Sequence, residues 1–381
     1  MVSPRRSAAF LPLLLVALLV LVLQASPAKA DNPDSAWGWS TIKPASGSEQ
    51  VTVPVRGSSA SILTLMDSSY TASKIKTVLI QVHGHGRDPW NYYNHNTAAR
   101  SKAESSLGVD PSTVLSIAPF FMGIGDKNNG AIPEGNPSNW LCFEGDYWAG
   151  GYSNLCPDGV QGVSSFEAMD ALVAWASNRS RFPNVDRVVI SGHSLGGQFV
   201  QRYAHFGRPS TSAELHFWVG NAASFLYYSK DRPVPLADLT ACKAYNRYLY
   251  GSAALSDRLG AYGVGDIGAA QSTYNSRNVH LGIGLQDHAA GVLGCEAKVQ
   301  GSGHYERATG YINYLRQFKG GFPSRHTVDY VTSSHDARTM LTKKVTLQRL
   351  FTDYYAKGIK TPSTLPNGSI NNGVQSTFAR T

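Results

Sequence analysis

A serine at position 194 stands in a pattern that proteins use to present a nucleophile. Gly192-His193-Ser194-Leu195-Gly196 fits G-x-S-x-G, in which the serine occupies a sharp turn between a strand and a helix. The apolar run 188–190 precedes it, and Phe199, Val200 and Tyr203 follow at helical spacing. Glycines relieve the crowding of such a turn, and the start of the helix supplies positive potential to a developing oxyanion. This context favours a nucleophilic serine over an ordinary turn.

A serine hydroxyl needs a base, and the base needs an acid that orients it, so two further side chains are required. In this strand–turn–helix architecture they follow in the order serine, acid, histidine, each after a later strand. Asp287 follows the apolar run 278–283 and lies 93 residues after Ser194. His335 follows the run 327–331 and lies 48 residues after Asp287. We therefore predict a catalytic triad of Ser194, His335 and Asp287.

Other roles for the predicted acid and base stay open at this point. Asp287 could cap a helix or a turn, in which case Asp266 is the rival acid. His335 could belong to a surface turn. His288 adjoins Asp287 and leaves no strand between acid and base, and His326 precedes the last apolar run and falls at the wrong end of a sheet.

Backbone N–H groups that stabilise an oxyanion are expected at two places. One is the residue after the nucleophile, Leu195, and the other is a glycine-rich loop after an early strand. The segment Val82-His83-Gly84-His85-Gly86 fits the second place, and we assign the donor there to Gly84 or His85. His83 and His85 could instead bind a metal, but alternate residues of an extended chain point in opposite directions and no acidic third ligand is near. No metal and no cofactor are predicted.

Short apolar runs alternate with helical patterns along the chain. Runs of this length that are rich in β-branched residues and bounded by turn residues indicate buried strands. Helical spacing occurs over 166–176, after Ser194, over 296–318 and over 337–355. The alternation predicts one α/β domain, 31–381, with a mostly parallel central sheet and helices on both faces. The six runs are 77–82, 112–117, 186–191, 215–219, 278–283 and 327–331.

Two long segments, 120–163 and 229–275, interrupt this alternation. Both are rich in aromatic residues and glycine, and long excursions from a sheet are often functional. We expect them to wall the pocket like a cap. Packing of their aromatic side chains against the sheet is an equally good explanation. The side chains expected to contact an apolar or sugar-like substrate are Trp140, Trp148, Tyr152 and Tyr227.

The four cysteines, Cys142, Cys156, Cys242 and Cys295, allow three disulfide pairings. We favour Cys142–Cys156 with Cys242–Cys295, because the short loop between the first two closes easily. No CxxC spacing occurs, which argues against a zinc site.

The first thirty residues have the composition of a secretory signal peptide. Arg5 and Arg6 precede the apolar stretch 8–23, and Ala28-Lys29-Ala30 is a small-x-small cleavage site. An uncleaved signal anchor is the alternative. We expect cleavage after Ala30 and an extracellular protein without stable membrane insertion. The leader holds three of the 34 basic residues and none of the 26 acidic ones, so the remainder has a net charge of +5. Its basic residues are scattered, and no nucleic-acid surface is predicted.

The motifs at 82–86 and 192–197, followed by Asp287 and His335, resemble the lipase and esterase branch of the α/β-hydrolase superfamily. The resemblance covers residues 77 to about 345. It implies a serine hydrolase that cleaves a small-molecule or polymer ester through an acyl-enzyme. The chain departs from the HGGG form of the oxyanion loop because His85 stands where a glycine is usual. A peptidase or thioesterase on the same scaffold, or a non-catalytic binding protein, are the alternatives, and the sequence gives no oligomeric state.

Overall fold

The computed structural model describes residues 38–57, 59–131, 133, 138–234 and 241–352. The chain divides into two units, Met1–Pro33 and Asp34–Thr381, and every described residue belongs to the second. The predicted signal peptide and its cleavage site therefore lie outside the described residues. Within the described part, no helix is both long and apolar enough to span a bilayer.

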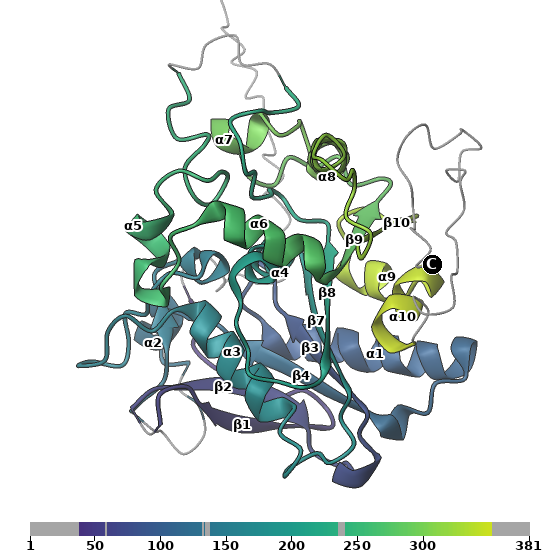
Figure 1. Cartoon of the computed structure of the whole chain (residues 1–381). Helices are drawn as coiled ribbons and strands as arrows, with labels where there is room; N and C mark the ends of the chain where they lie inside the picture. Colours follow the sequence, from purple (N-terminus) through teal and green to yellow (C-terminus); the bar gives the residue numbers. More distant parts are fainter. Residues whose placement is uncertain (1–37, 58, 132, 134–137, 235–240, 353–381) are drawn as a thin grey trace, which may run out of the picture. The chain divides into compact units, whose positions relative to one another are not determined.

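A mixed eight-stranded sheet with the order β1-β2-β4-β3-β7-β8-β9-β10 forms the centre of the second unit (Figure 1). From β4 to β10 all neighbouring strands are parallel, whereas β1 and β2 are antiparallel additions at one edge. The prediction of a mostly parallel sheet is confirmed. The strands are β1 Ser48–Pro54, β2 Ser61–Asp67, β3 Thr77–Val82, β4 Val114–Phe120, β7 Arg187–His193, β8 Glu214–Gly220, β9 Asn278–Gly284 and β10 Thr327–Val331, and β5 Met122–Gly123 pairs separately with β6 Cys142–Phe143.

Alternate residues of the strands enter two different hydrophobic cores. In β3, Val78 and Ile80 join the larger core, while Leu79 joins the core on the opposite face. In β7, Ile190 and Val189 divide in the same way. Because successive side chains of a strand point to opposite faces, a continuous apolar run can bury both faces of a sheet. The uninterrupted runs in the sequence therefore correspond to strands that are covered on both faces.

Helices cover both faces of the sheet (Figure 1). The smaller core brings α1 together with α9 and α10, and the larger core includes side chains of α3, α4 and α8. The α-helices are α1 Pro89–Leu107, α2 Ile124–Asn128, α3 Ser165–Ala176, α4 Leu195–Phe206, α5 Leu255–Leu259, α6 Ile267–Ser276, α7 Cys295–Lys298, α8 His304–Leu315, α9 Ala337–Thr342 and α10 Lys344–Phe351. The 3-10 helices are η1 Ala72–Lys74, η2 Pro111–Thr113, η3 Tyr147–Gly150 and η4 Gly260–Tyr262.

Three predicted elements differ in the structure. The helical pattern over 337–355 divides into α9 and α10 at Lys343, and its last three residues lie outside the described part of the chain. The helical pattern over 296–318 divides into α7 and α8, because Gly301, with φ of +150°, and Gly303 occupy the junction between them. The excursion 229–275 is less loop-like than its composition indicates, since it contains α5, η4 and most of α6. The excursion 120–163 carries α2, η3 and the small β5–β6 pair.

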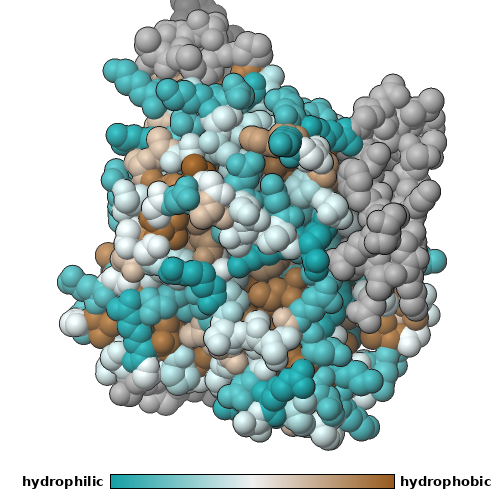
Figure 2. Space-filling view, in the orientation of Figure 1, coloured by the Kyte–Doolittle hydropathy of each residue, from teal (hydrophilic) through white to brown (hydrophobic). Residues whose placement is uncertain are grey.

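The surface carries no single large apolar area on the side seen in Figure 2, where apolar side chains are separated by hydrophilic ones. The most exposed large apolar side chain among the described residues is Leu293, at 70%.

The structure contains both favoured disulfides, Cys142–Cys156 and Cys242–Cys295. A disulfide restricts the unfolded chain, and its effect grows slowly with the length of the loop that it closes. For the bond that spans 14 residues, we expect that Cys142→Ser with Cys156→Ser lowers the free energy of unfolding by about 3 kcal/mol. For the bond that spans 53 residues, the corresponding double variant should lose about 4 kcal/mol. Equilibrium unfolding in denaturant measures both losses, and a larger loss for the short loop would contradict the expectation.

Candidate active site

Ser194 occupies a strained turn between β7 and α4. Its φ of +60° and ψ of −122° lie in a region that L-residues rarely adopt, which is expected of a nucleophile turn. A Cβ atom on Gly192 would approach the carbonyl oxygen of Gly196 to 2.3 Å, and one on Gly196 would approach the carbonyl oxygen of His83 to 2.5 Å. Side chains at either glycine would therefore clash with backbone. The turn holds the serine at the carboxyl end of β7.

The structure brings the three predicted triad residues together. The imidazole Nε2 of His335 lies 2.9 Å from Ser194 Oγ, and its Nδ1 lies 2.7 Å from Asp287 Oδ2. Asp287 follows β9 and His335 follows β10, so both side chains come from the same end of the sheet as Ser194. The distances fit a hydrogen-bonded chain from the carboxylate through the imidazole to the hydroxyl.

Asp287 is shared by two histidines. Its carboxylate is 1% exposed, and burial alone would raise its pKa. The close approach of His304 and the hydrogen bond from His335 outweigh that effect and hold the pKa of Asp287 well below its ordinary value. His304 Nδ1 lies 3.3 Å from Asp287 Oδ1 and donates to the carbonyl oxygen of Ala289 at 2.6 Å. Asp287 is therefore ionised at neutral pH.

Asn221 joins three strand ends at this site. It directly follows β8 and has a φ of +42°. Its Oδ1 accepts a hydrogen bond from the N–H of Gly284 at 2.7 Å, and its Nδ2 donates to the carbonyl oxygen of Ser334 at 3.1 Å. The same Nδ2 lies 3.4 Å from His193 Nε2. One amide thus links the end of β7, the end of β9 and the residue before His335.

His193 is neutral and packs beside the predicted base. Burial, followed by the nearby His335, lowers the pKa of His193 well below its ordinary value. The centroids of the two imidazole rings are 4.6 Å apart. His193 therefore fixes one side of His335, and His304, with its ring centroid 4.2 Å from that of His335, fixes another.

The loop after β3 lies beside Ser194 and contains two histidines that have different roles. His83 is buried: its Nε2 accepts a hydrogen bond from the N–H of Phe121 at 3.0 Å, so its Nδ1 carries the proton and donates to the carbonyl oxygen of Gly84. Burial lowers the pKa of His83 to about 3, and the ring is neutral. His85 is exposed and bonds elsewhere, so the two rings do not converge on a common ligand.

His85 and Leu195 line the pocket beside Ser194, which favours His85 over Gly84 as the oxyanion donor of this loop. Gly84 is buried and is not among the residues that line this pocket.

Asp146 raises the pKa of His85 through a hydrogen bond of 2.6 Å to Nδ1. Folding raises the pKa of His85, so its interaction with Asp146 stabilises the folded chain most fully below the ordinary histidine pKa of about 6.5. This stabilisation of the fold is lost as the pH rises through the pKa of His85 in the folded chain. Asp146→Asn should lower the pKa of His85. An NMR titration of the His85 ring in both proteins measures the shift, and an unchanged titration would show that the carboxylate has no influence.

The pocket at Ser194 has a volume of about 400 Å³ and is walled by histidines and other polar side chains together with small and aliphatic ones. The excursion 120–163 contributes only Asp146 to it, and 229–275 contributes none of the described lining residues. The expectation that both excursions wall the pocket is therefore wrong for the second. The wall comes instead from the segments after β8 and after Asp287. The lining residues are His85, Asp146, Ser194, Leu195, Gln198, Ala223, Ala289, Gly291, Val292, His304 and His335.

The four aromatic side chains expected at the substrate pocket do not line it. Trp148 is fully buried and stacks on Phe121, and Tyr227 is fully buried in the main core. Trp140 belongs to a core cluster beneath β2, and Tyr152 lines a different hollow of about 270 Å³. Large apolar surfaces gain more from burial in the fold than from exposure at a binding site, so the packing explanation fits all four.

Four polar residues of the site are absent from the sequence prediction: Asp146, Gln198, Asn221 and His304. Gln198 follows Ser194 by four residues and so lies on the same face of α4. Its polar character within an apolar helical pattern is a signal that the sequence offers. The partners of Asn221 and His304 depend on how separate strands and helices meet, and no local pattern shows this.

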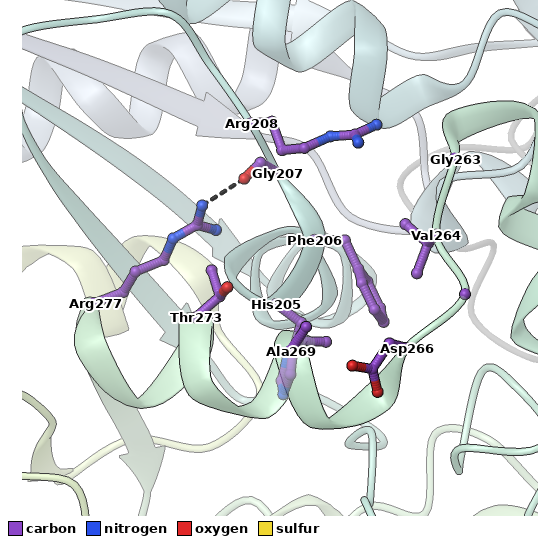
Figure 3. Close-up of a pocket in the computed structure, with 12 residues that line it drawn as sticks. His205, Phe206, Gly207, Arg208, Gly263, Val264, Asp266, Ala269, Thr273 and Arg277 are labelled. Atoms are coloured by element: carbon purple, nitrogen blue, oxygen red, sulfur yellow. Dashed lines mark hydrogen bonds between the residues drawn. The ribbon is translucent and has the colours of Figure 1, made fainter.

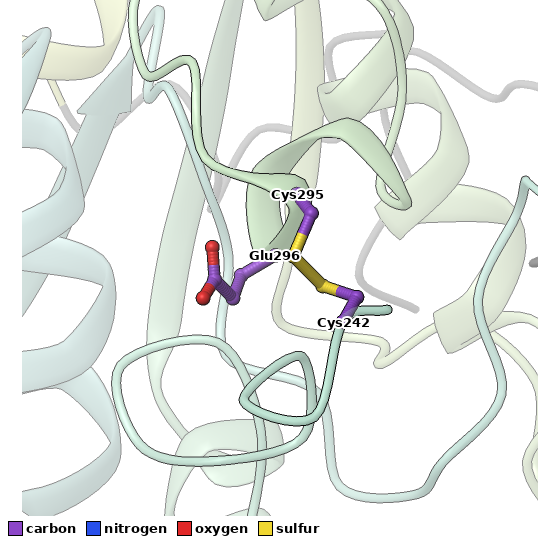
Figure 4. A group of neighbouring side chains, drawn as sticks. All are labelled: Cys242, Cys295 and Glu296. Carbon is purple, nitrogen blue, oxygen red and sulfur yellow. A yellow bond between two sulfur atoms is a disulfide. The ribbon is translucent and has the colours of Figure 1, made fainter. Parts of the chain in front are cut away.

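The remaining candidates have structural partners. Asp266, the rival acid, caps α6 by accepting from the N–H of Gly268 at 2.8 Å. His288 bonds Glu306, and His326 bonds the carbonyl oxygen of Tyr274 at the opposite end of β10. Cys242 and Cys295 lie beside Glu296, but their sulfur atoms are bonded to each other and offer no thiolate to a metal (Figure 4).

A second hollow, of about 460 Å³, lies between the end of α4 and the side of α6 (Figure 3). It is at the far end of α4, about 18 Å from Ser194 for a 12-residue helix. Its two guanidinium groups are already engaged, because Arg277 donates to the carbonyl oxygen of Gly207 and Arg208 to that of Tyr262. These contacts close the end of α4 and explain the arginines without a ligand.

No family model and no curated protein sequence matches the chain. Among solved structures, it is similar to poly(aspartic acid) hydrolase-1 from Sphingomonas sp. KT-1, with 18% identity, a TM-score of 0.52, and coverage of 81% of this chain and 99% of that one. LpqC, a poly(3-hydroxybutyrate) depolymerase from Bordetella parapertussis, gives 18% identity, a TM-score of 0.49, and coverage of 83% and 99%. The parallel sheet, the turn at Ser194 and this likeness identify the architecture: the chain has the α/β-hydrolase fold.

Proposed function

We propose that the protein is a serine hydrolase that cleaves ester bonds. The observation that carries the proposal is the hydrogen-bonded array from Asp287 through His335 to Ser194, with distances of 2.7 and 2.9 Å. A histidine in this arrangement can remove the hydroxyl proton, and a buried carboxylate can hold the required tautomer.

In the proposed reaction, Ser194 Oγ attacks the ester carbonyl carbon while its proton passes to His335 Nε2. The carbon–oxygen bond to the alcohol then breaks, and His335 returns the proton to the departing oxygen. Water next attacks the acyl-serine, again giving its proton to His335, and the acid leaves as Ser194 regains its hydrogen. Asp287 stays ionised and stabilises the imidazolium form of His335.

Stabilisation of the tetrahedral oxyanion is assigned to the backbone N–H groups of Leu195 and His85. Leu195 is the first residue of α4, so its N–H group lies where the helix has its positive end. The neutral His83 holds the loop by bonding the backbone of Phe121 and of Gly84. The oxyanion site therefore depends on fixed backbone dipoles rather than on a mobile charged side chain.

The N-terminal composition supports export of this hydrolase, and the two disulfides fit an oxidising compartment. A thioester or peptide substrate on the same array is the alternative, because the chemistry of the serine is shared.

A fluorophosphonate probe tests the proposal without a guess about the substrate. The purified protein should be labelled at Ser194, and peptide mass spectrometry locates the label. A panel of p-nitrophenyl esters, thioesters and peptides then separates the reaction classes. Absence of labelling at Ser194, with no hydrolysis of any panel member, would favour a binding protein that only keeps the fold.

A further inference from the structure

Gln198 places a buried amide in the wall of the Ser194 pocket. The residue is 4% exposed, and it lies one helical turn beyond the serine on α4. The rise of four residues along a helix is about 6 Å, so its amide is within a few bond lengths of an ester carbonyl held at Ser194. Among the pocket residues it is therefore well placed to contact a second functional group of a substrate.

The orientation of this amide is set by two donors. Its Oε1 accepts from Arg202 at 3.0 Å and from the hydroxyl group of Ser224 at 2.6 Å. A guanidinium group can only donate, so the oxygen must face Arg202 and the NH₂ group must take the other position. Arg202 is itself buried and donates to the carbonyl oxygens of Ala149 and Leu249. The amide is thus held by a rigid network behind the pocket wall.

The hydrogen bonds of Gln198 to described side chains are made by its Oε1, and its NH₂ group is not one of the fully buried polar atoms that lack a partner, although the residue lines the pocket. A donor that a pocket presents without a protein partner is available to a ligand, and a pocket usually contains a few such polar groups that select the ligand. The neighbouring wall residues Ala223, Ala289 and Val292 present only apolar side chains. The position therefore calls for an acceptor on the ligand.

We propose that Gln198 is a specificity-determining residue that donates a hydrogen bond to a second oxygen acceptor of the substrate. The substrate class is an ester with a keto, ester or amide carbonyl oxygen a few bonds from the scissile carbonyl, in preference to an ester of a plain hydrocarbon. This inference rests on the proposed hydrolase function. It extends that function, because the reaction at Ser194 itself requires nothing from Gln198.

Two pairs of esters of matched shape test the preference. In the first pair the acyl group differs, p-nitrophenyl 4-oxopentanoate against p-nitrophenyl 4-methylpentanoate. In the second the alcohol differs, 2-oxopropyl acetate against isobutyl acetate, followed by pH-stat. Each kcat/KM is divided by the rate constant for hydroxide-catalysed hydrolysis of the same ester. In at least one pair, we expect this ratio to be about tenfold higher for the ketone than for the hydrocarbon ester. A difference of this size corresponds to one hydrogen bond to a donor in the pocket wall.

Gln198→Met keeps the length of the side chain and removes the donor. It should reduce the preference in the responsive pair to about one, mainly by slowing the ketone. Gln201→Met is the matched control on the same helix: Gln201 is fully buried, bonds Tyr311 and does not line the pocket, so the preference should persist. Ser224→Ala removes one of the two donors that orient Gln198 and should weaken the preference partly, which gives a second variant if Gln198→Met does not fold.

The outcomes separate the two proposals. Hydrolysis of both members of both pairs without preference would overturn the role of Gln198 and leave the serine hydrolase intact. An equal loss for ketone and hydrocarbon in Gln198→Met would likewise overturn it, because a merely structural residue acts that way. If wild-type protein neither cleaves these esters nor reacts with a fluorophosphonate, the hydrolase proposal fails, and the inference fails with it.

Discussion

Replacing Ser194 with alanine is expected to reduce kcat/KM for a p-nitrophenyl ester by on the order of 10⁴- to 10⁶-fold. The hydroxyl group lies 2.9 Å from His335 Nε2, and its removal leaves the imidazole without a proton to accept. Only binding and oxyanion stabilisation would remain. Alanine has no difficulty with volume at this position, so the loss should appear in kcat while the fold is preserved. Steady-state kinetics and circular dichroism of the same preparation measure the two effects.

Ser191→Ala is a matched control for this variant. Ser191 lies three residues earlier on β7, is fully buried, and its hydroxyl oxygen has no hydrogen-bond partner among the described residues. Its replacement should leave activity within a few-fold of wild type. Comparable activity of Ser194→Ala and wild type would exclude the proposed nucleophile, whereas a loss in both variants would point to damage of β7.

Asp287→Asn is expected to lower kcat by about 10³- to 10⁴-fold, because an amide can hold His335 in the wrong tautomer and does not stabilise its positive charge. Asp266→Asn tests the rival acid. Asp266 caps α6 through the N–H of Gly268, and its variant should keep its activity. An active Asp287→Asn together with an inactive Asp266→Asn would reverse the assignment.

The effect of Asp287→Asn on the free energy of unfolding should depend on pH. The pKa of Asp287 is lower in the folded chain than its ordinary value of about 3.9, so the carboxylate contributes stability above that pH. The contribution is lost as the pH falls through the folded pKa. The difference in unfolding free energy between wild type and Asp287→Asn should therefore be largest near neutral pH and shrink below about pH 4. Denaturant unfolding of both proteins at several pH values measures this difference. A difference that stays constant with pH would show that the charge of Asp287 is not involved.

Local sequence patterns predicted most strands of the sheet and the positions of the three residues proposed to react. The run 77–82 corresponds to β3 and 327–331 to β10, because parallel strands that are covered on both faces are largely apolar. Ser194, Asp287 and His335 each follow a strand, so their convergence follows from the sheet order. The strands β1 and β2 form the antiparallel edge and are not among the predicted runs; β1 is partly exposed and its apolar signal is weak, whereas β2 is fully buried.

The pocket wall could not be predicted in the same way. Trp148 and Tyr227 have the chemistry of a binding site, but the packing of the core buries them. Ala223 and Gly291 have side chains with no distinguishing chemistry, but both line the pocket. They lie close together there, because a Cβ atom on Gly291 would come within 3.2 Å of the Cβ of Ala223. Whether a residue is buried in the core or lines the pocket depends on how distant segments fold against each other. The composition of the sequence does not contain that information.

Part of the pocket wall is formed by residues outside the proposed triad, which has a consequence for directed evolution. The proposed nucleophile, acid and base follow strand ends that Asn221 links to one another, while Ala223, Ala289 and Val292 lie on the segments beyond these ends. Larger or smaller side chains at those three wall positions can reshape the cavity without displacing the reaction centre. A library confined to them should thus yield catalysts with altered chain-length tolerance at little loss of turnover.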